Sequence, residues 1–473
     1  SVPPVWTAVA AAEESPAPDP VVQAEEVVVS ATKTPLPVTQ VTSAVEVITA
    51  QDMKRQNIRS VVDALRLAQG VAVFSNGGPG TEVTAKIRGG GANQTLVLID
   101  GAIVNSGTVG SYNFANLTTD NIERVEILRG SQSMLWGSDA MGGVINIVTK
   151  KGQGPLSATG FMEYGSFASL REGGTVSGKQ GAVDYSLSLS RWDTSSFSAV
   201  NYRRGATERD SYRNWQGSGR IGVDLPHDGR LDFSMRWMNS DVQLDNLSAT
   251  APSDVYGSKI RSQEYVFSGS YEQPLTSWWS QKLTLARSQE ASLFLPGTLQ
   301  RSLVSGAFST PFGDPNETRV LSNRLEWQHN FQITKLLLLS AGYQFREQQG
   351  ENDSGLTNRI LSSHAGFAQA QFNLWDRVFA TAGVRHDSYN VFGDATTYRL
   401  TGGYMHKETD TKLRAGYSTG FRAPSMNELY FPNFGNPNLG PEKSQSMDVG
   451  IDQYFFSKQL KFTGGFFWNR YRN

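Results

Sequence analysis

The residue types that carry out chemistry occur in this chain without the partners that chemistry needs. Gly217–Gly222 has the G-x-G-x-x-G spacing of dinucleotide-binding loops, but it lies in a strand-like segment with no helix after it. Gly173–Lys179 resembles a phosphate-binding loop, but Gln180 stands where Ser or Thr is required. The five histidines are scattered, there is no G-x-S-x-G elbow, and the absence of cysteine excludes disulfides, Cys-ligated zinc and thiol nucleophiles. We therefore predict no enzyme, no resident cofactor and no metal site.

Composition narrows the class of partner. The 473 residues include 43 basic and 44 acidic side chains, and a net charge of −1 argues against nucleic acid as the main partner. The longest purely aliphatic run is Leu336–Leu339, far below the roughly 18 residues of a membrane helix. A transmembrane β-barrel remains open, because its strands cross the bilayer on alternating residues.

Three zones follow from the glycine and proline distribution. Residues 1–69 contain no glycine, whereas residues 70–152 contain 15 in 83. The proline-rich leader, Ser1 to about Pro37, is predicted to be extended and largely unpacked. Ala8–Ala10 fits either the end of an export signal or an ordinary Ala-rich linker. Within the leader, Val27–Val29 has strong β-propensity and no core partner nearby, which favours pairing with an exposed strand edge.

The middle zone has mixed α/β patterns. Strands are predicted at the apolar runs Val45–Ile48, Leu96–Ile99, Val125–Leu128 and Val144–Val148. Thr49 can cap a short helix over Ala50–Gln56, and a second helix over Val61–Leu67 would close at Gly70. A block of about 115 residues is large enough to fold as one small domain.

From about Leu156 onward, apolar and polar residues alternate strictly, as in Val183–Leu189 and Leu231–Trp237. We count about 15 such strands, each with one apolar and one polar face. Tight turns alternate with long loops, at roughly 193–211, 241–258, 290–316, 347–359 and 421–440. Short turns at one rim and long loops at the other are typical of a transmembrane antiparallel β-barrel.

A soluble β-sandwich or propeller would also alternate. However, Arg, Gln, Glu and Asn occur on the polar face in mid-strand, where a lumen wall tolerates them and a packed sandwich interior does not. Bacterial single-chain barrels have even strand numbers, and an open edge in lipid leaves backbone groups unsatisfied. We therefore expect either a miscounted strand or, preferably, a chain truncated before barrel closure.

Several motifs carry a family resemblance. In order they are Ile87–Gly89, Leu96–Gly101, Ile122–Gly130 and Leu135–Lys150. This succession resembles the plug domain of TonB-dependent outer-membrane receptors. Further on, Gly420–Pro424, Asn427–Tyr430 and Gly435–Lys443 are similar to that family's barrel motif. The chain looks closest to the cobalamin and catecholate-siderophore branches of the family.

The resemblance implies a flexible periplasmic leader at residues 1–33, an α/β plug domain at 34–151 and an incomplete barrel at 152–473. A complete family barrel has 22 strands and encloses a lumen that side chains cannot fill, so the plug restores the seal. The resemblance also implies a plug–barrel lock in which Arg88 and Arg129 pair with barrel glutamates, Glu428 first and Glu442 second.

The acidic-led valine segment resembles the TonB box. Its residues would be Glu26, Val27, Val28, Val29, Ser30 and Ala31. The outer membrane has no ATP, so a short strand offered for β-augmentation would let the TonB energy-transducing protein pull on the plug. The alternative is that these valines form the first strand of the plug itself.

Ligand capture would involve the plug loops 74–81 and 105–112. The candidate contact residues, which are aromatic or neutral hydrogen-bonding side chains, are Phe74, Asn76, Asn93, Asn105 and Tyr112. Such groups suit a large polar macrocycle or metal chelate, a ferric siderophore or cobalamin, better than a bare cation. Some cobalamin receptors carry aspartate-rich calcium loops, but Asp193–Tyr212 has only Asp193, Glu208 and Asp210 among several arginines, so calcium is not expected there.

The resulting hypothesis is an energy-coupled importer, monomeric and embedded in the outer-membrane lipid of a Gram-negative bacterium. A passive porin or surface-binding barrel is the alternative, and the plug distinguishes the two because a diffusion channel has no use for one. A barrel enzyme would need a catalytic triad, which the sequence does not offer.

Overall fold

The computed structural model describes residues 27–473 apart from 201–202, 204–205, 207, 246–252, 312, 457–459 and 473. Glu26 therefore lies outside the described residues. The described chain has a small N-terminal α/β part and one large antiparallel sheet. No helix within these ranges is long and apolar enough to cross a membrane.

The α/β part is built on a five-stranded sheet in the order β3-β8-β9-β6-β7. Its strands are β3 (Ala44–Thr49), β6 (Thr95–Ile99), β7 (Ala102–Ile103), β8 (Ile122–Arg129) and β9 (Gly143–Thr149). The β6–β9 pair is parallel and the other pairs are antiparallel. All four strands predicted in this zone are confirmed.

Short elements surround this sheet. They are β1 (Val27–Val28), β2 (Leu36–Pro37), α1 (Ala50–Arg55), α2 (Val61–Leu67), β4 (Val71–Ser75), β5 (Val83–Ile87), η1 (Ala92–Gln94), η2 (Phe114–Asn116) and α3 (Ser133–Trp136). Thr49 caps α1 as predicted, in a capping box with Asp52. The second helix has the predicted bounds, Val61–Leu67, but it closes at Ala68, whose extended backbone angles make it the C-cap instead of Gly70.

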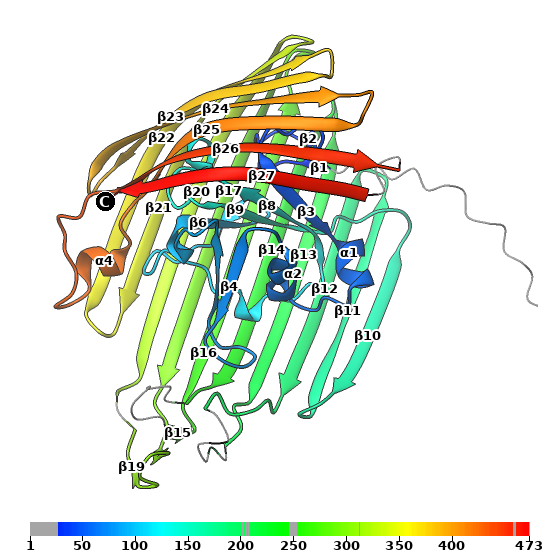
Figure 1. Ribbon diagram of the computed structural model, residues 1–473. Coiled ribbons are helices and arrows are strands. Elements are labelled where there is room, and N and C mark those ends of the chain that lie inside the picture. Colours follow the sequence, from blue (N-terminus) through cyan, green and yellow to red (C-terminus); the bar gives the residue numbers. More distant parts are fainter. Residues whose placement is uncertain are drawn as a thin grey trace, which may run out of the picture.

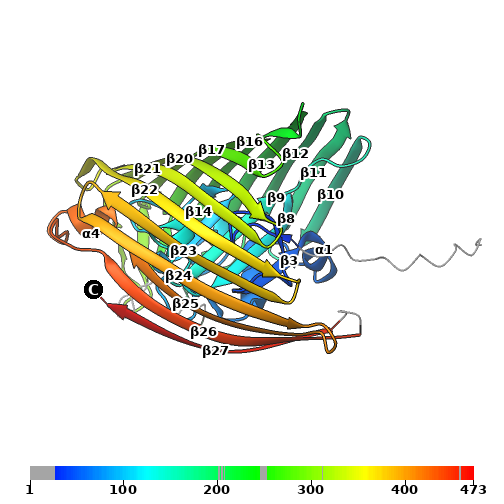
Figure 2. The ribbon, with the colours of Figure 1, turned by 90° about the horizontal axis from the view of Figure 1, so that it is seen from above.

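The large sheet has 15 strands, which confirms the predicted number. They are β10 (Ser157–Gly165), β11 (Ser169–Gln180), β12 (Val183–Thr194), β13 (Tyr212–Leu225), β14 (Gly229–Gln243), β16 (Lys259–Pro274), β17 (Trp279–Leu295), β20 (Asn316–Thr334), β21 (Leu337–Asn352), β22 (Leu356–Leu374), β23 (Val378–Tyr389), β24 (Gly393–His406), β25 (Thr411–Arg422), β26 (Glu442–Phe455) and β27 (Leu460–Arg472). Each strand pairs with the next one in this series. Figures 1 and 2 show the sheet curving around the α/β part, with β10 and β27 as its two edges.

The connections are short at one end of the sheet and mostly long at the other. At the long-loop end lie helix α4 (Met426–Tyr430) and a small sheet of β15 (Ser253–Tyr256), β18 (Leu299–Ser302) and β19 (Phe308–Ser309). The long loop predicted at 347–359 is wrong: β21 runs to Asn352 and β22 begins at Leu356, so polar residues there continue the two strands beyond the apolar band.

The two faces of the large sheet differ in the sense expected for a barrel. Inward-facing side chains such as Gln216, Gln344 and Arg385 are buried and polar, whereas outward-facing Leu187, Phe233 and Leu285 are exposed and apolar. A soluble sandwich would bury the second set. The apolar core lies instead inside the α/β part, where α2 and the sheet strands enclose Leu65, Ile87, Ile127 and Ile145.

Gly143, at the start of β9, provides a test of this core. A Cβ built there would lie 2.2 Å from the Leu128 carbonyl oxygen and 2.8 Å from Ile87 Cδ1. We expect Gly143→Ala to destabilise the α/β part by about 2 kcal/mol, because backbone cannot yield cheaply to an added methyl. Hydrogen exchange of the β8 and β9 amides would measure the loss. Gly366→Ala is the control, since nothing lies within 4 Å of its added Cβ.

Candidate functional site

The N-terminal segment Val27–Lys33 lies docked between the α/β part and the large sheet. Val27 and Val28 pair with Pro37 and Leu36 in a two-stranded ladder. Val28 is fully buried in an apolar cluster with side chains of α3, and Ala31 is buried beside it. The prediction of an unpacked leader is therefore wrong for residues 27–33, because these small apolar side chains fill space against the plug sheet.

Ser30 is held by hydrogen bonds to the plug interior. Its backbone N–H and its hydroxyl both donate to Glu126 Oε2, at 3.1 and 2.5 Å, and its carbonyl accepts from Trp136 Nε1 at 2.9 Å. Glu126 is fully buried and also pairs with Arg124 at 2.8 Å. A buried carboxylate needs such donors, so Ser30 is part of a satisfied polar cluster.

Lys33 connects this segment to the wall of the large sheet. Its ammonium lies 2.5 Å from Glu326 Oε2 on β20 and between the rings of Trp136 and Phe367, at 4.8 and 4.2 Å from their centroids. Burial lowers the pKa of Lys33 to about 7, although the charge of Glu326 opposes the shift. This is a desolvated ion pair between the N-terminal segment and the barrel wall.

Neutral and charged side chains of the wall complete the attachment. Gln369 and Gln371 of β22 donate to Thr32 O and Thr34 Oγ1, each at 3.1 Å. Arg399 of β24 donates to Ala31 O at 3.4 Å. These contacts reach backbone carbonyls and a hydroxyl group. They therefore fix where the segment lies but depend little on which side chains it carries.

The predicted lock between plug arginines and Glu428 or Glu442 is corrected by the structure. Arg88 lies 3.9 Å from Asp448 on β26 and stacks over Phe467 of β27 at 4.7 Å. Arg129 stays within the plug: it pairs with Glu46 at 3.3 Å and donates to Gln69 O at 2.9 Å.

Glu428 and Glu442 both pair with Arg422, at 2.8 and 2.6 Å. The register explains this choice, because Arg422 lies directly opposite Glu442 in the β25–β26 ladder. Glu442 still contacts the plug, by accepting from Gln94 Nε2 at 2.7 Å. Arg422 belongs to the G-F-R-A-P motif noted in the sequence, but no role was predicted for this arginine.

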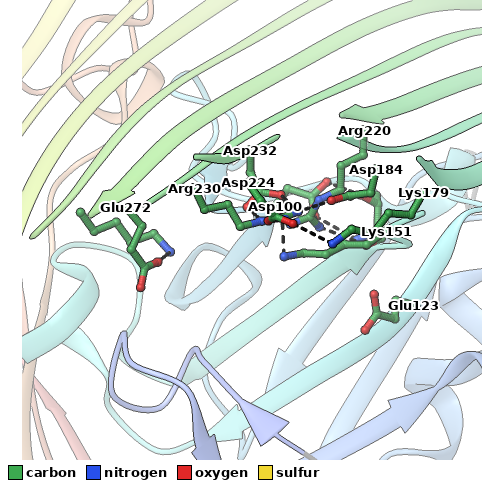
Figure 3. Close-up of polar contacts among 12 residues, drawn as sticks. Asp100, Glu123, Lys151, Lys179, Asp184, Arg220, Asp224, Arg230, Asp232 and Glu272 are labelled. Atoms are coloured by element: carbon green, nitrogen blue, oxygen red, sulfur yellow. Dashed lines mark hydrogen bonds and ion pairs between the residues drawn. The ribbon is translucent and has the colours of Figure 1, made fainter. Parts of the chain in front are cut away.

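A second attachment, missed by sequence reasoning, joins the C-terminal end of the plug to the wall (Figure 3). Arg220 of β13 bridges Asp100, which follows β6, at 3.4 Å and Asp232 of β14 at 3.5 Å. Lys151, just after β9, lies 3.7 Å from Asp232. The partners come from segments far apart in sequence. The one signal in the sequence was the presence of charged residues at polar-face positions of the alternating strands, which does not tell which residues pair.

Arg230 extends this network along the wall. It pairs with Asp184 at 2.7 Å, Asp224 at 2.6 Å and Asp232 at 2.8 Å, and Lys179 adds a further pair to Asp224. The plug is thus held by separate parts of the wall: the N-terminal segment by β20, β22 and β24, and the C-terminal end by β13 and β14.

Comparisons with protein families agree with this architecture. The model described as "TonB dependent receptor-like, beta-barrel" matches residues 184–473. The model of the TonB-dependent receptor plug domain matches residues 37–144. The chain belongs to the TonB-dependent receptor family.

Two of the most similar curated relatives are vitamin B12 transporters. The chain is 27% identical over 435 residues to the vitamin B12 transporter BtuB of Photobacterium profundum, covering 90% of this chain and 66% of the relative. It is 27% identical to the BtuB of Vibrio vulnificus strain YJ016, covering 91% and 68%. The chain thus spans about two thirds of the length of these relatives.

Solved structures show the same fold at lower identity. The siderophore receptor PirA from Acinetobacter baumannii matches with a TM-score of 0.75 at 20% identity, over 90% of this chain and 70% of the other. A mutant of the ferric enterobactin receptor PfeA from Pseudomonas aeruginosa matches with a TM-score of 0.72 at 20% identity, over 92% and 72%. Both likenesses agree with the overall fold of this TonB-dependent receptor.

The predicted ligand contacts divide into accessible and buried side chains. Phe74 and Asn76 are exposed, and Asn93 is half-buried. Asn105 is buried and shapes its own loop, accepting from Val97 N at 2.7 Å and donating to Thr95 O and Gly110 O. Tyr112 is also buried.

The Tyr112 hydroxyl donates to Glu264 of β16 at 3.1 Å. The prediction of ligand contacts is therefore corrected for Asn105 and Tyr112, whose polar groups are already used within the receptor.

Two loops at the long-loop end bring carboxylates together. Burial, with the charges of Asp245 and Asp254 from the second loop, raises the pKa of Glu208 in the first loop to about 7. Burial, with the charges of Asp245 and Glu208, raises the pKa of Asp210 to about 7 as well. Sequence reasoning considered only Asp193–Tyr212, where Asp193 pairs with Arg213 at 2.8 Å instead. Over the described ranges, no group of three or more His, Asp or Glu side chains is arranged to hold a metal ion.

Removing the partner of Lys33 tests the attachment of the N-terminal segment. In Glu326→Gln, Lys33 must stay buried without a counter-charge or lose its proton, and either cost favours undocking, by about 3 kcal/mol. We expect faster hydrogen exchange of the Val28–Lys33 amides. The Lys33→Met/Glu326→Gln double variant is the control, since it removes both charges and keeps an apolar side chain between the rings. Unchanged protection in Glu326→Gln alone would contradict the role of the pair.

The carboxylates of the two loops predict a pH dependence. A carboxyl group whose pKa is raised by folding contributes stability at low pH and loses it as pH rises from about 4 to about 7. Hydrogen-exchange protection of the Asp210 and Ser211 amides, corrected for intrinsic rates, should therefore fall about tenfold between pH 6 and pH 8. Asp245→Asn should flatten this dependence, because it removes a charge that acts on both groups.

Proposed function

We propose that this chain is the plug and most of the barrel of an energy-coupled outer-membrane importer. It would bind a large scarce ligand, a ferric siderophore or cobalamin, at the cell surface and release it to the periplasm when the plug rearranges. The proposed division is a leader at 1–33 in the periplasm, a plug at 34–151 and a barrel at 152–473 in outer-membrane lipid, acting as a monomer. The membership in a family of receptors and transporters supports this proposal.

The observation that carries the proposal is the docked N-terminal segment. Val27–Val28 is already a strand, and its ladder partner, Leu36–Pro37, is only two residues long. A short ladder is easily exchanged for a longer one offered by another protein, which is the geometry of β-augmentation. The TonB energy-transducing protein is the proposed partner, and the segment must leave Glu126 and Glu326 before that partner can pair with all of it.

The polar plug–wall interface supports movement of the plug. The contacts described above are hydrogen bonds and ion pairs, which water can replace when the plug shifts. Most of the apolar core lies within the plug, although Val266 of β16 and Ala286 of β17 also pack against it. A passive porin, the alternative, would gain nothing from a docked strand or from a domain that occupies its lumen.

Val28→Pro tests the coupling. Proline removes a backbone donor from the segment, so pairing with another strand should be lost. We expect ligand uptake by energised cells to fall to the level of cells without a proton gradient, while ligand binding to the cell surface is unchanged. Val27→Ile is the matched control, because it keeps a β-branched side chain and the backbone donor. Normal uptake in Val28→Pro would refute energy coupling through this segment.

The ligand can be identified by titration of the purified receptor. The panel is cobalamin, a ferric catecholate siderophore, a ferric hydroxamate siderophore and heme. Binding of each ligand is measured by the quenching of tryptophan fluorescence. The relatives named vitamin B12 transporters put cobalamin first. We expect one member to bind in the nanomolar range, and binding by cobalamin alone would eliminate the iron-chelate assignment. Phe74→Ala should weaken that binding, because Phe74 is an exposed aromatic side chain near the end of β4.

A further inference from the structure

The large sheet opens locally where β24 and β25 separate at the long-loop end. Pairing between these strands stops at Arg399 and Ser418. On either side the ladders continue further, β23–β24 to Gly393 and β25–β26 to Arg422. In the opening, the Thr419 hydroxyl takes the place of a strand carbonyl and accepts from Tyr398 N at 3.0 Å.

This separation leaves a cavity of about 520 Å³ in the outer face of the sheet. The side chains with outward parity include Thr396 and Tyr398 on one side and Lys443, Gln445, Arg470 and Arg472 on the other. In Figure 1 the end of β27 that carries Arg472 lies on the same side of the molecule as α4. The cavity is therefore at the rim that carries the long loops.

Three positively charged side chains, Lys443, Arg470 and Arg472, line the cavity. Lys443 lies directly opposite Arg472 in the β26–β27 ladder, and Gln445 lies opposite Arg470. None of the three cations forms an ion pair with a carboxylate in the part of the chain that the structure describes. The one carboxylate in the lining, Asp394, is itself 4.0 Å from His386. Like charges directly opposite in a sheet are destabilising, so a bound anion would relieve this arrangement.

The surroundings indicate what kind of anion fits. Along the same outward face, toward the short-turn end, the exposed side chains become apolar at Met447, Val449 and Ile451 on β26 and at Phe466 on β27. Met447 is four residues from Lys443, or about 13 Å along the strand. A molecule that spans both regions has an anionic head and apolar chains.

We propose that this opening binds the phosphate-bearing head of a lipid in the outer leaflet of the membrane, with its acyl chains along the apolar rows below. The proposal rests on the membrane position assigned under the proposed function. Arginine forks match phosphate oxygens in two-point contacts, and lysine adds a point charge. The hydroxyls of Thr396 and Tyr398 and the amide of Gln445 offer hydrogen bonds to the sugar or glycerol part of the head.

The test uses the full chain in detergent and native mass spectrometry to count bound lipid. The probes are a diphosphorylated glucosamine lipid, phosphatidylcholine and inorganic phosphate. We expect the diphosphorylated glucosamine lipid to bind at one site. Phosphatidylcholine, whose head is zwitterionic, should bind weakly. Inorganic phosphate should compete poorly because it lacks the acyl chains. The triple variant K443Q/R470Q/R472Q should bind this lipid at least about tenfold more weakly, which corresponds to a loss of about 1.4 kcal/mol of binding free energy.

A matched control removes three charges from the same end of the sheet. Arg213, Arg261 and Arg319 are exposed, and each already pairs with a carboxylate, at 2.8 to 2.9 Å. The variant R213Q/R261Q/R319Q should bind the phosphorylated lipid like the unmodified chain. R470K/R472K keeps the charges and should retain binding within about threefold, which separates loss of the site from loss of the fold.

Equal loss in the two triple variants would overturn the proposal, because binding would then follow net charge alone. Full competition by inorganic phosphate would also overturn it and reduce the opening to a simple anion site. Equal binding of phosphatidylcholine would show that only the apolar rows are recognised.

Discussion

The structure depends on one constraint: the polar inner face of the large sheet has to be satisfied without a hydrophobic core of its own. Arg385, Gln344 and Gln369 point inward and are almost completely buried. Buried polar groups cost several kcal/mol each when they lack partners. The plug supplies such partners through its backbone carbonyls as well as its side chains, as in Arg385 to Leu135 O and Arg324 to Gly101 O.

This constraint explains why the plug is stabilised from within but positioned by polar contacts at its surface. Its stability comes from the apolar cluster that α2 and the sheet enclose, whereas its position comes from polar contacts at the surface. The charged network around Arg230 and Asp232 anchors the end where the plug joins β10, and Lys33 with Glu326 holds the segment where the chain enters. A pull on the N-terminal segment would meet the Lys33–Glu326 pair first.

The same alternation of side chains gives the outer face its apolar band and the inner face its polar one. A lipid site at the opening between β24 and β25 would use the outer face in a way that transport does not require. A lipid bound there would fill the place where the β24–β25 ladder is incomplete. In the same way, the plug supplies partners to polar groups of the inner face that would otherwise lack them.

The alternating pattern by itself determined the sheet, its 15 strands and the orientation of each face, since a period of two leaves no other arrangement once polar residues occupy mid-strand positions. It also determined the plug strands and the cap at Thr49, which are local. Partner choice across the lumen was decided only by tertiary structure: Arg422, not Arg88 or Arg129, took Glu428 and Glu442 because strand register placed it opposite one of them. The docking of Val27–Lys33 and the burial of Tyr112 were likewise decided in three dimensions, because they depend on partners such as Glu326 and Glu264, which lie far away in the sequence and which no local pattern encodes.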